Sequence, residues 1–249
     1  MPRHHRPSAV PAGLVLLAAL VAPAFAQDAR TGAAKPGAIC PDLPDLGGTL
    51  RRARVVAEGR VAFVRSADSD PACPSLAPAC REKAFLVPGN DVIRGASSGV
   101  FACATYVGVT GQIRSGWLPE RALADDAPAT VCLADWIGTW MSGPEQTVTI
   151  QRKSECLVLS GTASYGTQNP ERVKRGAINM GSFEAELAPD SQDIAWTDGE
   201  KAVMPGFRPD EVSRCSVRMR LMPPDLVAES NGACGGMNVT FSGVYRRGG

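Results

Sequence analysis

From residue 50 to the C-terminus, short runs of Val, Ile, Phe and Tyr are interrupted by Gly, Pro and Asp. Apolar residues at helical spacing are scarce after the first 26 residues. Short apolar runs with these interruptions are typical of β-strands joined by tight turns. We therefore expect an all-β protein built from many short antiparallel strands.

The clearest strand pattern lies at the end of the chain, in residues 231–247. Polar and apolar residues alternate there, and the apolar side of an extended chain would carry Met237, Val239, Phe241 and Tyr245. A period of two is typical of a strand with one buried face. It predicts a strand over 237–247 that closes a small antiparallel barrel.

The N-terminus is predicted to be a signal peptide, residues 1–26. Two arginines precede an apolar run over 9–21, and Ala24-Phe25-Ala26 supplies the small residues that signal peptidase requires. The apolar run is too short to favour a membrane-spanning helix. We therefore expect a bacterial protein that is periplasmic or secreted, begins at Gln27 after cleavage and has no membrane span.

Charge and histidine content exclude several classes of function. Cleavage of the signal peptide would lower Lys+Arg from 26 to 24 against 25 Asp+Glu, a net charge near −1 that gives no basis for nucleic-acid binding. Both histidines, His4 and His5, lie in the signal peptide. The mature protein therefore lacks the residue needed for Ser-His-Asp or Cys-His catalysis and for most catalytic zinc sites. The sequence contains no Cys-x-x-Cys pair, which is the spacing typical of a thiolate metal site, and we expect no cofactor.

Composition predicts four parts in the mature chain: a flexible leader over 27–39, a first domain over 40–123, a linker over 124–131, and a second domain over 132–249. The leader has no periodicity, and the linker is a run of small and acidic residues with one proline. Both domains are predicted to be all-β.

The first domain ends in Gly116-Trp117-Leu118, and a Pro88-Gly89 turn lies upstream. These features, over residues 54–123, resemble the bacterial Src-homology-3-like (SH3-like) domains. The resemblance implies a small barrel that binds cell-wall peptides or docks a neighbouring domain. Three aromatic residues would then be candidates for a platform on which a peptide stacks: Phe101, Tyr106 and Trp117. The alternative is that they are core residues of the barrel.

The second domain is predicted to have eight or nine strands, which suits a closed, antiparallel up-and-down β-barrel without exposed edges. It opens with Gly138-Thr139-Trp140 and ends with Arg246 and Arg247. This combination resembles the lipocalins, in which a tryptophan near the barrel's end packs under an arginine from the closing strand. The resemblance implies that Trp140 and Arg246, or Arg247, close a small lipocalin-like barrel filled mostly by side chains.

Two stretches of the second domain resemble the periplasmic lysozyme inhibitors. Residues 160–165 are similar to their Ser-Gly-x-x-Tyr loop but have one additional residue, and residues 196–202 are similar to their Trp-Thr-Lys-Gly stretch but have Asp198 in place of lysine. The resemblance implies a loop that enters the cleft of a cell-wall hydrolase. The ligand-binding residues would be Ser160, Tyr165, Trp196 and Lys201.

Eight cysteines in an exported protein predict disulfide bonds. Cys73 and Cys80 enclose a short loop. The turn formers Pro223-Pro224-Asp225 predict a hairpin that places Cys215 beside Cys234. The remaining four cysteines could pair in three ways, one of which is 40 with 103 and 132 with 156. The full set of predicted disulfide cysteines is Cys40, Cys73, Cys80, Cys103, Cys132, Cys156, Cys215 and Cys234.

Acidic residues gather at Glu184, Glu186, Asp190, Asp193, Asp198 and Glu200. Two carboxyl groups that face one sugar across a cleft would suit a glycosidase. The plainer alternative is that Glu184 and Glu186 form the solvated face of a strand whose inner face carries Phe183, Ala185 and Leu187.

Three functional hypotheses follow. The first is a non-enzymatic cell-envelope binding protein that recognises a peptide, a glycan or an exported protein partner. The second is an inhibitor of a cell-wall hydrolase such as lysozyme. The third is a carboxylate-dependent glycan hydrolase, which needs no histidine.

Overall fold

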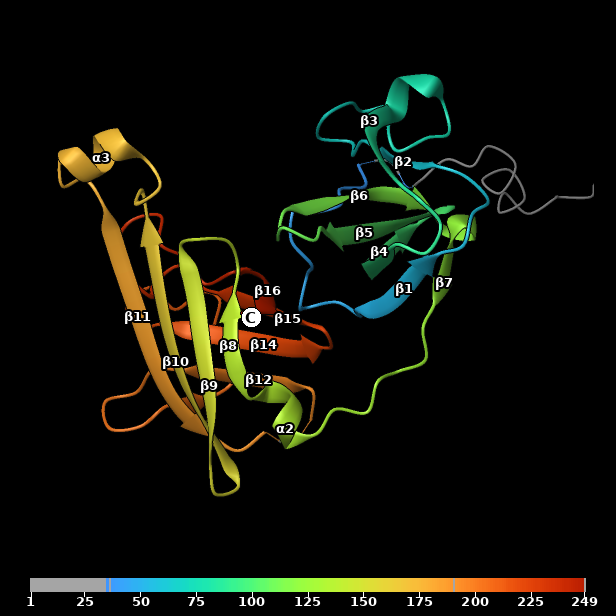
Figure 1. Ribbon diagram of the computed structural model, residues 1–249. Helices are drawn as coiled ribbons and strands as arrows, with labels where there is room; N and C mark the ends of the chain where they lie inside the picture. Colours follow the sequence, from blue (N-terminus) through green and yellow to red (C-terminus); the bar gives the residue numbers. More distant parts are fainter. Residues whose placement is uncertain (1–34, 36, 190, 249) are drawn as a thin grey trace, which may run out of the picture.

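The computed structural model describes residues 35, 37–189 and 191–248 as two curled antiparallel sheets (Figure 1). The predicted signal peptide and most of the predicted leader lie outside these residues. The expectation of an all-β protein is confirmed. No helix in the described part of the chain is long and apolar enough to cross a membrane.

The first sheet has seven strands in the order β3-β2-β6-β5-β4-β1-β7. Its strands are β1 (Arg51–Val55), β2 (Val61–Val64), β3 (Arg81–Leu86), β4 (Asp91–Ser98), β5 (Phe101–Val107), β6 (Ile113–Pro119) and β7 (Leu123–Asp125). Single 3-10 turns precede β3 and follow β6, η1 (Pro78–Cys80) and η2 (Glu120–Ala122). The Pro88-Gly89 turn separates β3 from β4, and Gly89 has a φ of +86°, which favours glycine.

The second sheet has nine strands in the order β11-β10-β9-β8-β16-β15-β14-β12-β13. Its elements are α2 (Leu133–Trp136), β8 (Gly138–Met141), β9 (Gln146–Lys153), β10 (Cys156–Tyr165), α3 (Pro170–Lys174), β11 (Asn179–Leu187), β12 (Asp193–Thr197), β13 (Met204–Pro205), β14 (Ser216–Met222), β15 (Asp225–Ser230) and β16 (Gly243–Arg247). All neighbouring strands are antiparallel.

The prediction of a closed barrel is wrong. In a closed up-and-down barrel β11 would pair with β12, but in the described residues β11 ends the sheet and β12 pairs only with β13 and β14. The second sheet is therefore a half-barrel. The loop between β15 and β16 covers part of the gap, because Gly181 and Gly235 form a β-bridge and the Gly236 N–H donates to the Met180 carbonyl at 3.0 Å.

This loop also corrects the prediction for the last strand. Only residues 243–247 form a strand, and residues 237–242 belong to the loop that lies against β11. A Cβ on Gly181 would lie 2.2 Å from the Cys234 carbonyl oxygen, so the crossing needs glycine there. Val239, Phe241 and Tyr245 are buried as expected, but Met237 is 78% exposed because the chain has turned away from the core.

Aromatic side chains fill the gap between β11 and β12. The Phe183 ring lies edge-on to the rings of Trp196 and Phe241, with centroid distances of 5.2 and 4.7 Å. The buried Tyr245 hydroxyl donates to the Phe241 carbonyl at 2.8 Å, and burial raises the pKa of this hydroxyl. Side-chain packing thus replaces the missing strand pairing.

Three disulfides form among the described residues: Cys40–Cys103, Cys73–Cys80 and Cys215–Cys234. The predicted Cys73–Cys80 and Cys215–Cys234 pairs are confirmed, and Cys40–Cys103 is selected from the open alternatives. The prediction that Cys132 and Cys156 are also bridged is wrong. Cys132 caps the start of α2 and Cys156 begins β10, so separate elements hold the two free thiols. Three disulfides fit an extracellular or periplasmic protein.

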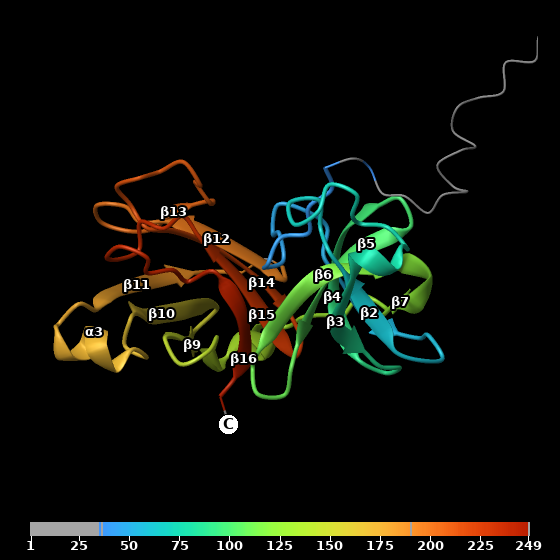
Figure 2. The ribbon, with the colours of Figure 1, turned by 90° about the horizontal axis from the view of Figure 1, so that it is seen from above.

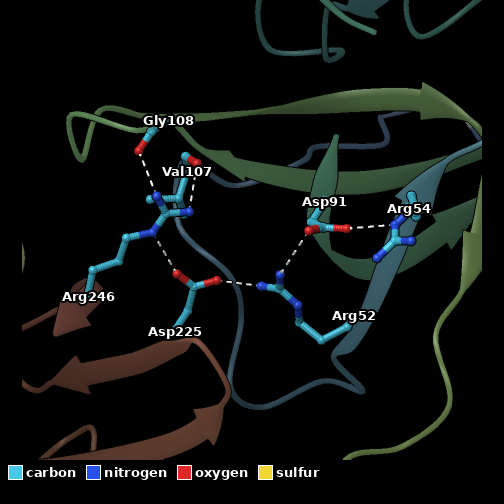
Figure 3. Close-up of polar contacts among 7 residues, drawn as sticks. All are labelled: Arg52, Arg54, Asp91, Val107, Gly108, Asp225 and Arg246. Carbon is cyan, nitrogen blue, oxygen red and sulfur yellow. Dashed lines mark hydrogen bonds and ion pairs between the residues drawn. The ribbon is translucent and has the colours of Figure 1, made fainter. Parts of the chain in front are cut away.

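The two sheets lie side by side (Figure 2) and share an apolar cluster. The carboxylate of Asp225 bridges them through arginine side chains (Figure 3). Asp225 is 1% exposed and accepts hydrogen bonds from Arg52 of β1 and from Arg246 of β16, the latter at 3.0 Å. Arg246 also donates to the Val107 and Gly108 carbonyls, both at 2.9 Å. Apolar side chains surround these contacts: Leu46, Leu50, Ile93, Val107, Met222, Val227 and Val244.

The predicted barrel-closing pair is corrected by the same contacts. Arg246 extends toward the first sheet and not toward Trp140. The guanidinium of Arg247 lies 4.9 Å from the centre of the Trp140 ring, and these two residues are also partners in the β16–β8 register. Successive residues of a strand point to opposite faces, so only one of the two arginines can cover the tryptophan.

Candidate functional site

A hollow of about 470 Å³ on the first sheet is lined by Arg60, Arg81 and Arg121. We call it the arginine groove. Arg60 precedes β2, Arg81 begins β3 and Arg121 lies in η2. Its other lining residues include Ala62, Val64, Ser75, Leu76 and Pro119. The groove therefore combines three guanidinium groups with an apolar floor.

The three arginines take part in no salt bridge among the described residues. The Arg60 guanidinium makes a cation–π contact, in which it lies 4.3 Å from the centre of the Phe85 ring. Nearby carboxylates are engaged elsewhere, since Glu82 pairs with Arg114 and Glu120 pairs with Arg94 at 2.7 Å. Among the residues that the structure describes, no carboxylate lines the groove, so the positive charge of the three arginines is uncompensated there.

Local pairing explains how the sequence builds this site. Ala62 is the partner of Phe85 and Val64 is the partner of Arg81 in the β2–β3 register, which shifts between these two pairs. The pairing brings Arg81 of β3 next to the residues of β2 that line the groove. The loop between β2 and β3 contributes Ser75 and Leu76. Figure 1 shows this loop and η1 next to β2 and β3.

The Cys73–Cys80 disulfide restrains that loop, and we expect its removal to weaken the groove. Replacing both cysteines by serine should lower the free energy of unfolding by about 2–3 kcal/mol, because the unfolded chain regains the freedom of a short closed loop. Urea denaturation would measure the loss. Cys132→Ser, at an exposed free thiol, is the control and should change stability by less than about 0.5 kcal/mol. Equal effects of the two changes would contradict the role of the disulfide.

Two further hollows share Thr49, Arg51 and Asp125; the first also reaches Leu221 and Met222 of the second sheet, and the second lies on the first sheet alone. Their volumes are about 370 and 470 Å³. The charges there are already paired, because Asp125 accepts hydrogen bonds from Arg51 at 3.2 Å and from Arg94 at 2.9 Å. Burial opposes ionisation of Asp125, but these two arginines outweigh it and lower the pKa of the carboxyl. Because their charges are already paired, these two hollows are less suited to a charged ligand than the arginine groove is.

The aromatic residues proposed as a stacking platform are placed mainly inside the first sheet. Phe101 is fully buried, Trp117 is 2% exposed and Tyr106 is partly buried. Phe101 and Trp117 pack together with all four cysteines of the Cys40–Cys103 and Cys73–Cys80 disulfides. These three residues form no surface platform. Phe101 and Trp117 are core residues, as the alternative interpretation predicted.

The residues suggested by the lysozyme-inhibitor resemblance are dispersed. Residues 160–165 lie within β10, which pairs with β9 on one side and β11 on the other, so the prediction of an inhibitory loop there is wrong. Ser160 and Tyr165 are exposed on this strand, and Trp196 is buried in β12. Lys201 is exposed in the turn after β12.

None of the described acidic residues proposed for a glycosidase site, Glu184, Glu186, Asp193, Asp198 and Glu200, lines any of the hollows above. Glu184 and Glu186 lie on the exposed face of β11 while Phe183 and Ala185 are buried, as the strand alternative expects. Glu186 pairs with Lys153 at 2.7 Å and Asp193 pairs with Arg220 at 2.6 Å. Burial raises the pKa of Asp198. Glu200 is exposed, and Asp190 lies outside the described residues.

A comparison with known proteins gave no match: no protein family, no curated protein and no solved structure is similar enough to the chain to assign it. The resemblances to SH3-like domains, lipocalins and lysozyme inhibitors therefore stay predictions. The arginine groove, which sequence reasoning missed, is the best candidate site.

Proposed function

We propose that the protein is a non-enzymatic cell-envelope binding protein that takes an anionic partner into the arginine groove. The observation that carries this proposal is the set of three unpaired guanidinium groups around one hollow that contains no carboxylate. A guanidinium presents a planar fork of donors that matches carboxylate or phosphate oxygens. The absence of histidine from the sequence after residue 26 supports binding over most hydrolytic chemistry.

The groove is lined by both charged and apolar side chains, which favours a macromolecular or organic anion over a simple inorganic ion. Apolar side chains from both β2 and the disulfide loop line the groove together with the arginines. A ligand that fills the groove must cover these surfaces as well as neutralise charge, because burial of apolar area contributes about 25 cal/mol per Å². Peptides and glycans with acidic groups meet both conditions.

We expect the triple variant Arg60→Ala, Arg81→Ala, Arg121→Ala to bind fluorescein-labelled poly-L-glutamate at least about tenfold more weakly than the unmodified protein. Each arginine that pairs with a carboxylate at a partly exposed site contributes roughly 0.5–1 kcal/mol, and 1.4 kcal/mol corresponds to a factor of ten. Fluorescence anisotropy at low ionic strength would measure the change, and added salt should weaken binding to the unmodified protein.

A charge-matched control separates the groove from net charge. Arg175, Arg208 and Arg214 are exposed, lie in the second half of the chain and do not line the groove. Replacing these three by alanine removes the same charge, and affinity for poly-L-glutamate should fall by less than about threefold. Equal losses in the two triple variants, or no binding by the unmodified protein, would refute the proposed site.

A further inference from the structure

We propose that the anionic partner is an extended acidic peptide that adds to the first sheet as an eighth strand, along the free edge of β3. This inference rests on the proposed function and specifies both the ligand class and how it binds. It depends on three features of β3: an edge without a partner, one cationic face, and continuity of that face with the arginine groove.

β3 is the terminal strand of the first sheet. It pairs with β2 on one side, and no other strand in the described part of the chain pairs with its second side. An edge strand presents a row of N–H and C=O groups that can hydrogen-bond to another chain in an extended conformation. Peptides that bind in this way obtain affinity from the main chain and specificity from alternate side chains.

The side chains of β3 alternate sharply. Arg81, Lys83 and Phe85 are exposed on one face, while residues 82, 84 and 86 are partly or fully buried on the other. Like Arg81, Lys83 takes part in no salt bridge among the described residues. The exposed face of this edge strand is therefore cationic over its first half and aromatic at its end.

The same face leads directly into the arginine groove. Phe85 and Arg81 are register partners of Ala62 and Val64, which form the groove floor. Arg60 lies over the Phe85 ring and also lines the groove, so it joins the two surfaces. An added strand would run past Arg81 and Lys83 with the remaining groove arginines beside it.

Strand geometry defines the peptide pattern. Residues two apart on a strand are about 6.6–6.8 Å apart and point to the same face, and directly opposed side chains of paired strands are neighbours. Acidic residues at two alternate positions would face Arg81 and Lys83, and an apolar residue two positions further would face Phe85. An antiparallel peptide with this pattern is Thr-Leu-Thr-Glu-Thr-Glu.

The charge of β3 also selects against the simplest competitor, a second copy of the same strand. Antiparallel pairing of two β3 edges would place positive side chains near one another, which is unfavourable, whereas an acidic strand is attracted. Charged edge strands commonly prevent aggregation in this way. On β3, Arg81 and Lys83 would repel another positively charged strand but attract a negatively charged one.

The decisive test uses three versions of the hexapeptide Thr-Leu-Thr-Glu-Thr-Glu, labelled with fluorescein. The first is unmodified, and the other two carry N-methyl groups on alternate residues, one version on odd positions and the other on even positions. All three have the same charge, but N-methylation removes backbone donors. In a strand only one set of alternate N–H groups faces the neighbouring strand. We expect one methylated version to bind at least about tenfold more weakly and the other to bind within about threefold of the unmodified peptide.

A charge exchange tests the side-chain contacts. Lys83 is exposed, so Lys83→Glu should leave the fold intact. We expect this change to weaken the acidic hexapeptide by about tenfold, and a peptide with lysine in place of the glutamate opposite position 83 to recover binding to the variant. Glu58→Lys, at an exposed position before β2, is the control and should not reduce affinity.

The outcomes separate this inference from the proposed function. Equal binding of both methylated versions would overturn strand addition, as would binding of poly-L-glutamate without binding of the hexapeptide; in both cases the anion-binding function would stand. Failure of poly-L-glutamate itself to bind would overturn the proposed function and this inference together. Slower hydrogen exchange at β3 backbone amides on addition of the unmodified hexapeptide would support strand addition.

Discussion

Replacing Asp225 by alanine is expected to lower the free energy of unfolding by about 3–5 kcal/mol. The Asp225 carboxylate is buried at the contact between the two sheets and pairs with Arg52 and Arg246 (Figure 3). Removing one partner of a buried ion pair leaves the other charge desolvated without compensation, which costs this amount in comparable cases. Here two guanidinium groups would lose the same partner.

Urea denaturation followed by far-UV circular dichroism would measure this loss. Because Asp225 lies between the sheets, we also expect the variant to unfold in two separated transitions if the unmodified protein unfolds in one. Asp193→Ala is the matched control. Its carboxylate also pairs with an arginine, Arg220, but its side chain is 47% exposed, and exposed pairs contribute about 0–1 kcal/mol. Similar losses in both variants would show that the buried position of Asp225 is not responsible.

The strands could be predicted from the sequence because their signal is local. The alternation of Phe183, Glu184 and Ala185 needs only the period of two, and the structure places the apolar members inside. The turn formers at 223–225 predicted the hairpin of β14 and β15, and with it the Cys215–Cys234 disulfide. Strands and tight turns, which depend on residues close together in the sequence, could therefore be predicted.

The open barrel could not be predicted in this way. Residues 237–245 alternate as well as any strand, yet six of these nine residues form no strand, because a tight contact between Gly181 and Gly235 holds the loop against β11. That contact joins residues far apart in the sequence. Neither glycine signals it locally, so the pattern predicted a strand where tertiary packing imposes a crossing.

The candidate site was missed for a related reason. Arg60, Arg81 and Arg121 come from three separate segments and meet only through the β2–β3 register and η2. The basic run that is visible in the sequence, Arg52 and Arg54 among it, is used in ion pairs with Asp225 and Asp91. Unpaired charge is a property of the folded surface, and the composition of a segment does not reveal it.

Replacing Phe241 by alanine should open the half-barrel at its gap and lower the free energy of unfolding by about 3–5 kcal/mol. Large-to-small changes of buried phenylalanine have this cost because a cavity remains, and the Phe241 ring is fully buried against Phe183. The Tyr245 hydroxyl would keep its acceptor, since that acceptor is the backbone carbonyl of residue 241. The loss would therefore report side-chain packing between β11 and β12.

Two measurements would check this result, namely urea denaturation and tryptophan emission. Trp196 touches the same cluster through Phe183 and is buried, so water entering the gap should shift its emission to longer wavelength and increase its quenching by acrylamide. Met237→Ala is the control from the same loop, because that side chain is largely exposed and its loss should change stability by less than about 0.5 kcal/mol. If Phe241→Ala and Met237→Ala behaved alike, the aromatic cluster could not be the element that substitutes for the missing β11–β12 pairing. A large effect of Phe241→Ala alone would mean that packing of Phe183, Trp196 and Phe241 connects β11 to β12, which have no backbone pairing with each other.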